Sequence, residues 1–160
     1  MTIALLGLLL TLSFPAMHNL HSTRAMRTQV NDLVHAIHLA RHTALISGNT
    51  ITLCPSHDGN RCDYDAGWND GWLLFTDAGS ALRPQVNSAG DVLLSHRTST
   101  PLHISANRPV FRLRSYGRRS TNGTFMFCDP RGRVDARRLV ISYTGKPRAE
   151  PAPPDRCVTT

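Results

Sequence analysis

The chain has 160 residues, of which 41% are hydrophobic and 18% are charged, and its formal net charge is +7. A chain of this length builds one modest domain around a single core, and we expect no second domain. The charge is uneven, because residues 97–160 carry 13 Lys and Arg against 4 Asp and Glu, whereas residues 1–96 carry 5 Arg against 7 Asp. The C-terminal part, at +9, is either a solvated basic face or a surface that attracts nucleic acid, anionic lipid or an acidic partner.

The chain opens with an apolar stretch, residues 1–20, in which His18 is the only ionisable side chain. A helix that spans a membrane needs about 20 apolar residues, whereas the core of a signal peptide needs only about 7–15. No Lys or Arg precedes Arg24, and no A-x-A site follows the stretch, so a cleaved signal peptide fits poorly. We therefore expect residues 1–20 to form a hydrophobic, membrane-anchoring helix segment.

The next segment, residues 21–47, is expected to continue this helix as an amphipathic spine. Its apolar residues recur at alternating steps of four and three, which places them on one face of a helix. They are Met26, Val30, Leu33, Ile37, Ala40 and Ala44. Pro15, further upstream, is a position at which the continuous helix can kink.

Residues 48–160 change to short β-branched or aromatic runs that are separated by clusters of turn residues. One long helix followed only by strands predicts an α+β domain in which the helix packs on an antiparallel β-sheet. Trp68 and Trp72 are expected to pack in its core. The tail, residues 147–155, contains four prolines, so we expect it not to pair as a strand and to stay loose unless Cys157 anchors it. The predicted strands are Thr50–Leu53, Gly71–Thr76, Asp91–Ser95, Leu102–Ser105, Val110–Leu113, Thr124–Cys128 and Arg138–Tyr143.

Four cysteines, Cys54, Cys62, Cys128 and Cys157, lie in segments rich in Gly, Asp, Asn and Pro. Cysteines in a small exported domain of this kind are typically joined in disulfides. Three connectivities are possible, and we favour Cys54 with Cys62 and Cys128 with Cys157, because eight residues across a turn-rich loop suit a local bond. We therefore expect the folded part of the chain in an oxidising compartment.

Five segments occur in an order and at a spacing that resemble one protein family. They are Leu39–Arg41, Ile51–Ser56, Gly71–Asp77, Gly123–Cys128 and Arg137–Arg148. Together they look like the FimT/GspH family of type IV minor pilins and type II secretion pseudopilins. The resemblance implies a pilin-like fold, in which a long N-terminal helix is both membrane anchor and domain spine. It also implies a single-pass inner-membrane protein with its globular domain in the periplasm, without enzymatic activity or cofactor, whose partners are other pilin or pseudopilin subunits.

Members of this family begin with a short basic leader that ends in Gly and is followed by an aromatic residue and a glutamate. None of these features appears in this sequence. We expect that Met1 is a misassigned start and that the in-frame DNA upstream encodes the leader. A stop codon directly upstream would instead indicate a subunit that is held in the membrane but is not processed.

The strongest candidate site follows the last predicted strand, where Gly145 permits a tight turn that presents Lys146 and Arg148. In the FimT branch of the family, a Gly-Arg-x-Arg motif at this position is associated with DNA capture during natural transformation. The resemblance implies the same role here, with Lys146 as a cation that lacks the bidentate phosphate geometry of Arg. Neighbouring strand residues point to opposite faces, so only one of Arg137 and Arg138 joins this patch, and we assign Arg138 to it. Further cations that could broaden the surface are Arg112, Arg114, Arg118, Arg119, Arg131 and Arg133.

Two functions follow from these observations. In the first, the chain is a minor pilin that acts in type IV pilus biogenesis and binds double-stranded DNA without sequence preference, through phosphate contacts. In the alternative, it is the H-type pseudopilin of a type II secretion system, a structural subunit with protein partners only.

An enzyme or a metal protein is disfavoured. The loop from Cys54 to Arg61 resembles a phosphate-binding nucleophile loop, but six residues separate the two where such a loop has five. His35, His38 and His42 gather on the helix away from its apolar stripe, and no third-ligand motif accompanies them. We therefore assign no catalytic residue, no metal ligand and no cofactor.

Overall fold

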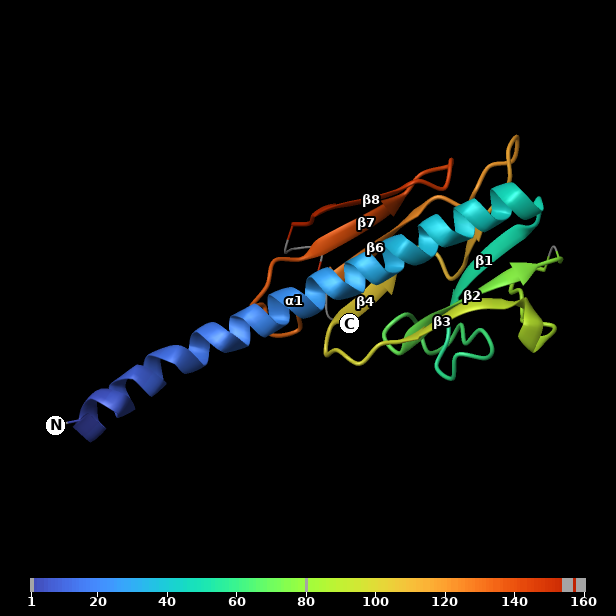
Figure 1. Cartoon of the computed structure of the whole chain (residues 1–160). Helices are drawn as coiled ribbons and strands as arrows, with labels where there is room; N and C mark the ends of the chain where they lie inside the picture. Colours follow the sequence, from blue (N-terminus) through green and yellow to red (C-terminus); the bar gives the residue numbers. More distant parts are fainter. Residues whose placement is uncertain (1, 80, 154–156, 158–160) are drawn as a thin grey trace.

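The computed structural model describes residues 2–79, 81–153 and 157. One long helix is followed by two four-stranded antiparallel sheets, and the helix packs on both of them (Figure 1). The N-terminal part of the helix extends well beyond the sheets. The architecture is the predicted α+β class, with a long N-terminal helix as the spine of a β-rich domain.

The described residues form one α-helix, one short 3-10 helix and eight strands. Each observed strand that was predicted lies within two residues of its predicted bounds. The elements are α1 (Thr2–Ser47), β1 (Thr50–Pro55), β2 (Gly71–Asp77), η1 (Ala89–Asp91), β3 (Val92–Arg97), β4 (His103–Ala106), β5 (Phe111–Leu113), β6 (Gly123–Cys128), β7 (Arg137–Ile141) and β8 (Pro147–Pro151).

The helix α1 buries one face and exposes the other. The six apolar residues predicted to share a face, from Met26 to Ala44, are each at most 1% exposed. His35, His38 and His42 are exposed on the rest of the surface of the helix. Its backbone continues through Pro15 without interruption. Within the part of the chain that the structure describes, no helix contains a stretch both long and apolar enough to cross a membrane.

The first three strands lie in one sheet and the last three in the other, while β4 and β5 cross over between them. The first sheet has the order β3-β2-β1-β5, and the second has the order β4-β6-β7-β8. Each neighbouring pair is antiparallel. The sequence predicts a single sheet, and the structure corrects this, because β4 leaves the first sheet and pairs with β6 rather than with β3.

A single main core lies between α1 and the inner faces of both sheets. Aromatic rings fill its centre: Trp68 meets Phe125 edge-on at 4.7 Å between ring centroids, and Phe111 stacks on Phe125 at 4.6 Å. Trp68 and Trp72 are 5% and 3% exposed, which confirms that both belong to the core. Buried residues alternate with partly buried or exposed ones along β6 and β7, so the outer face of the second sheet carries Thr124, Met126, Arg138 and Val140.

The prediction that the proline-rich tail cannot form a strand is wrong for residues 147–151, which form β8. Pro147 and Pro151 are the two end residues of β8, and β8 is an edge strand, where the missing N–H of proline interrupts no further pairing. The residues between them pair with β7, with Arg148 opposite Val140 and Glu150 opposite Arg138. Of the rest of the predicted loose segment, residues 152–153 belong to no strand, and residues 154–155 lie outside the described residues.

Two disulfides close loops of the domain. Cys54 in β1 is bonded to Cys62, and Cys128 at the end of β6 is bonded to Cys157, with Cα–Cα distances of 5.6 Å and 5.8 Å. This is the connectivity that the spacing favours. The thiol of Cys54 is therefore not available as a nucleophile.

Candidate functional site

The β7–β8 turn, residues 142–146, packs closely on the domain. The Gly145 N–H donates to the Ser142 carbonyl oxygen at 2.9 Å, and Gly145 has a φ of +73°. A Cβ at this position would lie 3.0 Å from Leu113 Cδ1 and 3.2 Å from Ser120 Oγ. Both the backbone conformation and the close approach of these side chains therefore require glycine here.

A side chain from the helix holds this turn in place. Arg41 Nε donates a hydrogen bond to the Thr144 carbonyl oxygen at 3.1 Å, although 103 positions separate the two residues. The turn closes when the Ser142 N–H donates to the Lys146 carbonyl oxygen at 3.1 Å. The turn therefore packs beside the C-terminal end of α1, and Lys146 and Arg41 line the same pocket.

This pocket, which we call the basic pocket, has a volume of about 470 Å³. The C-terminal end of α1, the segment after β5 and the β7–β8 turn form its walls, and no acidic residue lines it. Within the described part of the chain, no carboxylate forms an ion pair with any of its cations. These cations are Arg41, Arg114, Arg118, Arg119 and Lys146.

The electrostatics around Arg114 show how crowded the positive charge is. Burial, together with the nearby guanidinium groups of Arg118 and Arg112, lowers the pKa of Arg114. Arg114 Nη1 donates to the Arg119 carbonyl oxygen at 2.9 Å, but its buried Nε has no hydrogen-bond partner among the described residues. An anion in the pocket would reduce the mutual repulsion of these guanidinium groups.

Two tyrosines complete the walls of the basic pocket. Tyr116 is 90% exposed and Tyr143 is 56% exposed. The guanidinium carbon of Arg119 lies 5.6 Å from the ring centroid of Tyr143, within cation–π range. The pocket thus combines five cations with two exposed aromatic rings.

The other cations of the predicted site lie elsewhere, on the outer face of the second sheet. Glu150 lies directly opposite Arg138 of β7 and two positions after Arg148 in β8, so it is a neighbour of both arginines. Arg138 Nε is 2.6 Å from Glu150 Oε1, at an angle that suits an ion pair but not a hydrogen bond, and Arg148 Nε is 3.4 Å from Glu150 Oε2. We call these three residues the Glu150 cluster. The structure thus places Lys146 in the wall of the basic pocket and Gly145, buried, in the same turn, and it leaves Arg138 and Arg148 outside the pocket.

The further cations from the sequence also separate into two groups. Arg114, Arg118 and Arg119 line the basic pocket, whereas Arg112 and Arg133 form ion pairs. The sixth, Arg131, belongs to neither group and is exposed in the loop between β6 and β7. Arg112 Nε lies 3.1 Å from the buried Asp77 carboxylate, so this pair belongs to the framework of the first sheet.

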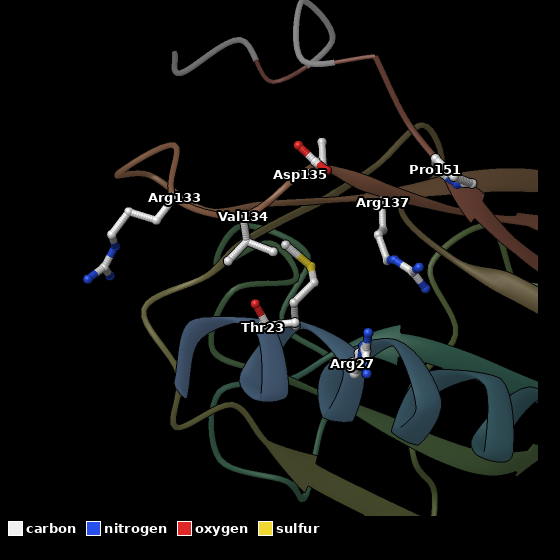
Figure 2. A pocket seen from close by; sticks show the side chains of 9 residues that line it. Thr23, Arg27, Arg133, Val134, Asp135, Arg137 and Pro151 are labelled. Carbon is white, nitrogen blue, oxygen red and sulfur yellow. The ribbon is translucent and has the colours of Figure 1, made fainter. Parts of the chain in front are cut away.

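A second pocket, of about 290 Å³, lies at the opposite end of β7 (Figure 2). Arg137 of β7 points towards α1, Arg27 of α1 also lines this pocket, and Asp135 points away. Arg137 therefore contributes to this second pocket, while its neighbour Arg138 joins the Glu150 cluster. Since Arg27 is far along the helix from Arg41, it provides a matched control for the basic pocket.

Sequence reasoning missed three residues of the basic pocket, namely Arg41, Tyr116 and Tyr143. Arg41 sits in the helical segment, and nothing in its neighbourhood along the chain indicates that its partner is the carbonyl of Thr144. The tyrosines carried a weak signal, because each lies within three residues of a cation in a segment rich in turn residues.

Comparisons with known proteins agree with this architecture. The chain matches the model of the family described as type II transport protein GspH over residues 29–145. No curated protein matches it. Two crystal forms of the type IV minor pilin FimU of Pseudomonas aeruginosa PAO1 are similar in structure. One is 18% identical, with a TM-score of 0.55 over 84% of this chain and 92% of FimU. The other is 20% identical, with a TM-score of 0.50 over 81% of this chain and 94% of FimU.

At such identities the FimU structures show the fold alone, which is a long helix packed on antiparallel sheets. The family model, in contrast, spans most of the chain, from the helical spine to the β7–β8 turn. The chain therefore belongs to the GspH/FimT family and has the pilin fold.

Proposed function

We propose that this chain is a minor pilin of a type IV pilus, a structural subunit rather than an enzyme, which acts in pilus biogenesis together with other pilin subunits. The family supports a role as a filament subunit, and the fold shared with the minor pilin FimU supports the type IV pilus. Residues 1–20 are the membrane anchor in this proposal, residues 21–47 are the spine, and residues 48–160 are the periplasmic domain. Two disulfides suit the oxidising periplasm on the outer side of the inner membrane.

The proposal includes sequence-independent binding of double-stranded DNA, as in natural transformation. The single observation that carries it is the basic pocket, where five cations line one hollow without an acidic residue. Such a surface binds phosphates and releases counterions, and it needs no element that reads base edges. Of the residues in the predicted site, Lys146 is placed to contribute most, with Gly145 as the residue that shapes its turn. Arg138 and Arg148 contribute less, because Glu150 offsets their charge.

Mobility shifts of duplex DNA over a salt series test the DNA-binding part of this proposal. The full chain in a non-ionic detergent is compared with the variant Lys146→Gln/Arg118→Gln. The control is Arg24→Gln/Arg27→Gln, which removes the same amount of charge from the helix, outside the basic pocket. A log–log slope near −0.9 per phosphate contact predicts that the first pair flattens the salt dependence by about 2. Equal affinities and equal slopes in all three proteins would reduce the basic pocket to a solvated face.

The alternative is the H-type pseudopilin of a type II secretion system. The observation that favours it is the description of the matching family, type II transport protein GspH. Deletion of the gene in its own host separates the two functions, since loss of pili and of DNA uptake supports the minor pilin. Loss of protein secretion with normal pili would instead support the pseudopilin.

A further inference from the structure

We infer that the basic pocket holds one unpaired nucleotide of a single strand, with its base stacked on Tyr116 or Tyr143 and the flanking phosphates on the surrounding cations. This inference rests on the proposed DNA binding and specifies the form of nucleic acid that the site prefers. It assigns a role to two residues that a purely electrostatic surface would not need.

The cations that line the basic pocket come from three separate elements of the fold. Arg41 comes from the end of α1, Arg118 and Arg119 come from the segment after β5, and Lys146 comes from the β7–β8 turn. A strand that crosses the pocket therefore meets positive charge from three elements. Because Arg41 is bonded to Thr144 through Nε, the pocket is partly preorganised before any ligand binds.

The tyrosines supply what phosphate binding alone does not explain. A single exposed aromatic residue is ordinary on a protein surface. Here, however, Tyr116 and Tyr143 are both exposed, and both line the pocket whose cations form no ion pair with a carboxylate of the described residues. Aromatic side chains beside a cationic track are the usual means by which proteins bind single strands without sequence preference.

The size of the pocket also favours a single nucleotide. A volume of about 470 Å³ falls in the range of pockets that hold small organic ligands. In a duplex the bases are stacked inside the helix, so a base reaches the tyrosines only if it is unpaired and turned out. A single strand presents its bases without the free-energy cost of unpairing and unstacking them. It should therefore bind more tightly than a duplex of equal length.

The experiment compares three 20-nucleotide ligands of mixed sequence with the full chain in detergent. They are a single strand, the duplex of the same sequence, and a single strand of abasic sites that keeps every phosphate. Fluorescence anisotropy at one moderate salt concentration gives the three dissociation constants. Since stacking on an aromatic residue strengthens binding by about fivefold to 150-fold per base, we expect the single strand to bind at least about fivefold more tightly than the abasic strand and the duplex.

Two variants locate this preference in the pocket. Tyr116→Leu/Tyr143→Leu keeps apolar bulk but removes both rings, so it should lower the affinity for the single strand to that for the abasic strand, without a change for the duplex. Tyr116→Phe/Tyr143→Phe keeps the rings and should retain the preference. Both residues are exposed, and circular dichroism checks that each variant is folded.

The outcomes separate this inference from the proposed function. Equal affinity for all three ligands, or an unchanged preference in the leucine variant, would overturn the nucleotide pocket and leave phosphate-based DNA binding intact. Binding to none of the three would overturn both. Equal binding of the free mononucleotide and the 20-nucleotide strand, at the same nucleotide concentration, would also contradict the inference, because it would mean that the flanking phosphates contribute nothing.

Discussion

The basic pocket is lined in part by the β7–β8 turn, the Glu150 cluster lies on β7 and β8 themselves, and both are rich in cations. They differ in their carboxylates: none lines the basic pocket, whereas Glu150 lies between Arg138 and Arg148 in the cluster. The positive charge of the pocket is thus available to an anion from outside, while that of the cluster is already partly used within the protein. The comparison shows that the number of cations in a segment does not measure its capacity to bind phosphate.

The largest expected effect is the loss of stability on removal of the disulfide between Cys128 and Cys157. Cys128→Ser/Cys157→Ser removes a bond that spans 29 positions and restrains the chain beyond β8. On the chain-entropy model, this should lower the free energy of unfolding by about 3 kcal/mol. Urea denaturation followed through the fluorescence of the buried Trp68 and Trp72 measures it. An unchanged midpoint would show that the edge strand β8 needs no covalent anchor.

A smaller loss of stability is expected on the side of the basic pocket. Gly145→Ala forces a non-glycine residue into positive φ and places its Cβ against Leu113 and Ser120, which should cost about 1–2 kcal/mol or slightly more. Gly132→Ala is the matched control, since Gly132 has a φ of +63° with no atom within 4 Å of the added Cβ. Equal losses of stability in the two variants would mean that the packing around Gly145 contributes nothing beyond its backbone conformation.

Removal of the Glu150 carboxylate should make the cations of the Glu150 cluster as available to DNA as those of the basic pocket. Glu150→Gln leaves Arg138 and Arg148 without their counterion, so the affinity for duplex DNA at low salt should rise by about threefold to tenfold. Mobility shifts measure the change, with Asp135→Asn, in the loop before β7, as a control for net charge. If both variants strengthen binding equally, net charge alone determines the affinity and the position of Glu150 is irrelevant.

The smallest effect is a change in the dependence of stability on pH, and it is expected at Asp58, a carboxylate that accepts hydrogen bonds from its own loop. In the loop closed by Cys54 and Cys62, the backbone N–H of Asn60 donates to Asp58 at 2.9 Å and lowers the pKa of its carboxyl group. Because the pKa of Asp58 is lowered in the folded state, its carboxylate stabilises the protein when the pH is above the ordinary pKa of 3.8. This contribution is lost as the pH falls from there through the lowered pKa of the folded state. Asp58→Asn should therefore reduce the dependence of stability on pH in this acidic range. Identical acid unfolding curves for the variant and the parent would contradict this assignment.

The sequence predicts the local features of this fold well, because they depend on periodicity. The buried stripe from Met26 to Ala44 follows from steps of three and four, and the strands follow from short runs between turn residues. The division into two sheets was not predictable in this way, because it depends on β4 pairing with β6 rather than with its neighbour in the sequence. The strand β8 was missed because its prolines prevent pairing in a central strand but not at the ends of an edge strand.

The candidate site was only partly predictable for the same physical reason. Gly145 and Lys146 were identified because a turn glycine beside a cation is a local pattern. The contact between Arg41 and Thr144, and the position of Glu150 opposite Arg138, depend on tertiary packing and on strand register. Long-range geometry thus decides which of the many arginines remain available.

The most direct test of this account compares two single substitutions that remove the same charge, Lys146→Gln and Arg148→Gln. The salt dependence of duplex DNA binding by the full chain is measured for each variant and for the parent. If the basic pocket binds phosphate and Glu150 already offsets Arg148, Lys146→Gln should flatten the log–log slope by about 0.9, and Arg148→Gln should leave it nearly unchanged. A flatter slope for Arg148→Gln with an unchanged slope for Lys146→Gln would contradict the account and would move the DNA-binding surface to the outer face of the second sheet.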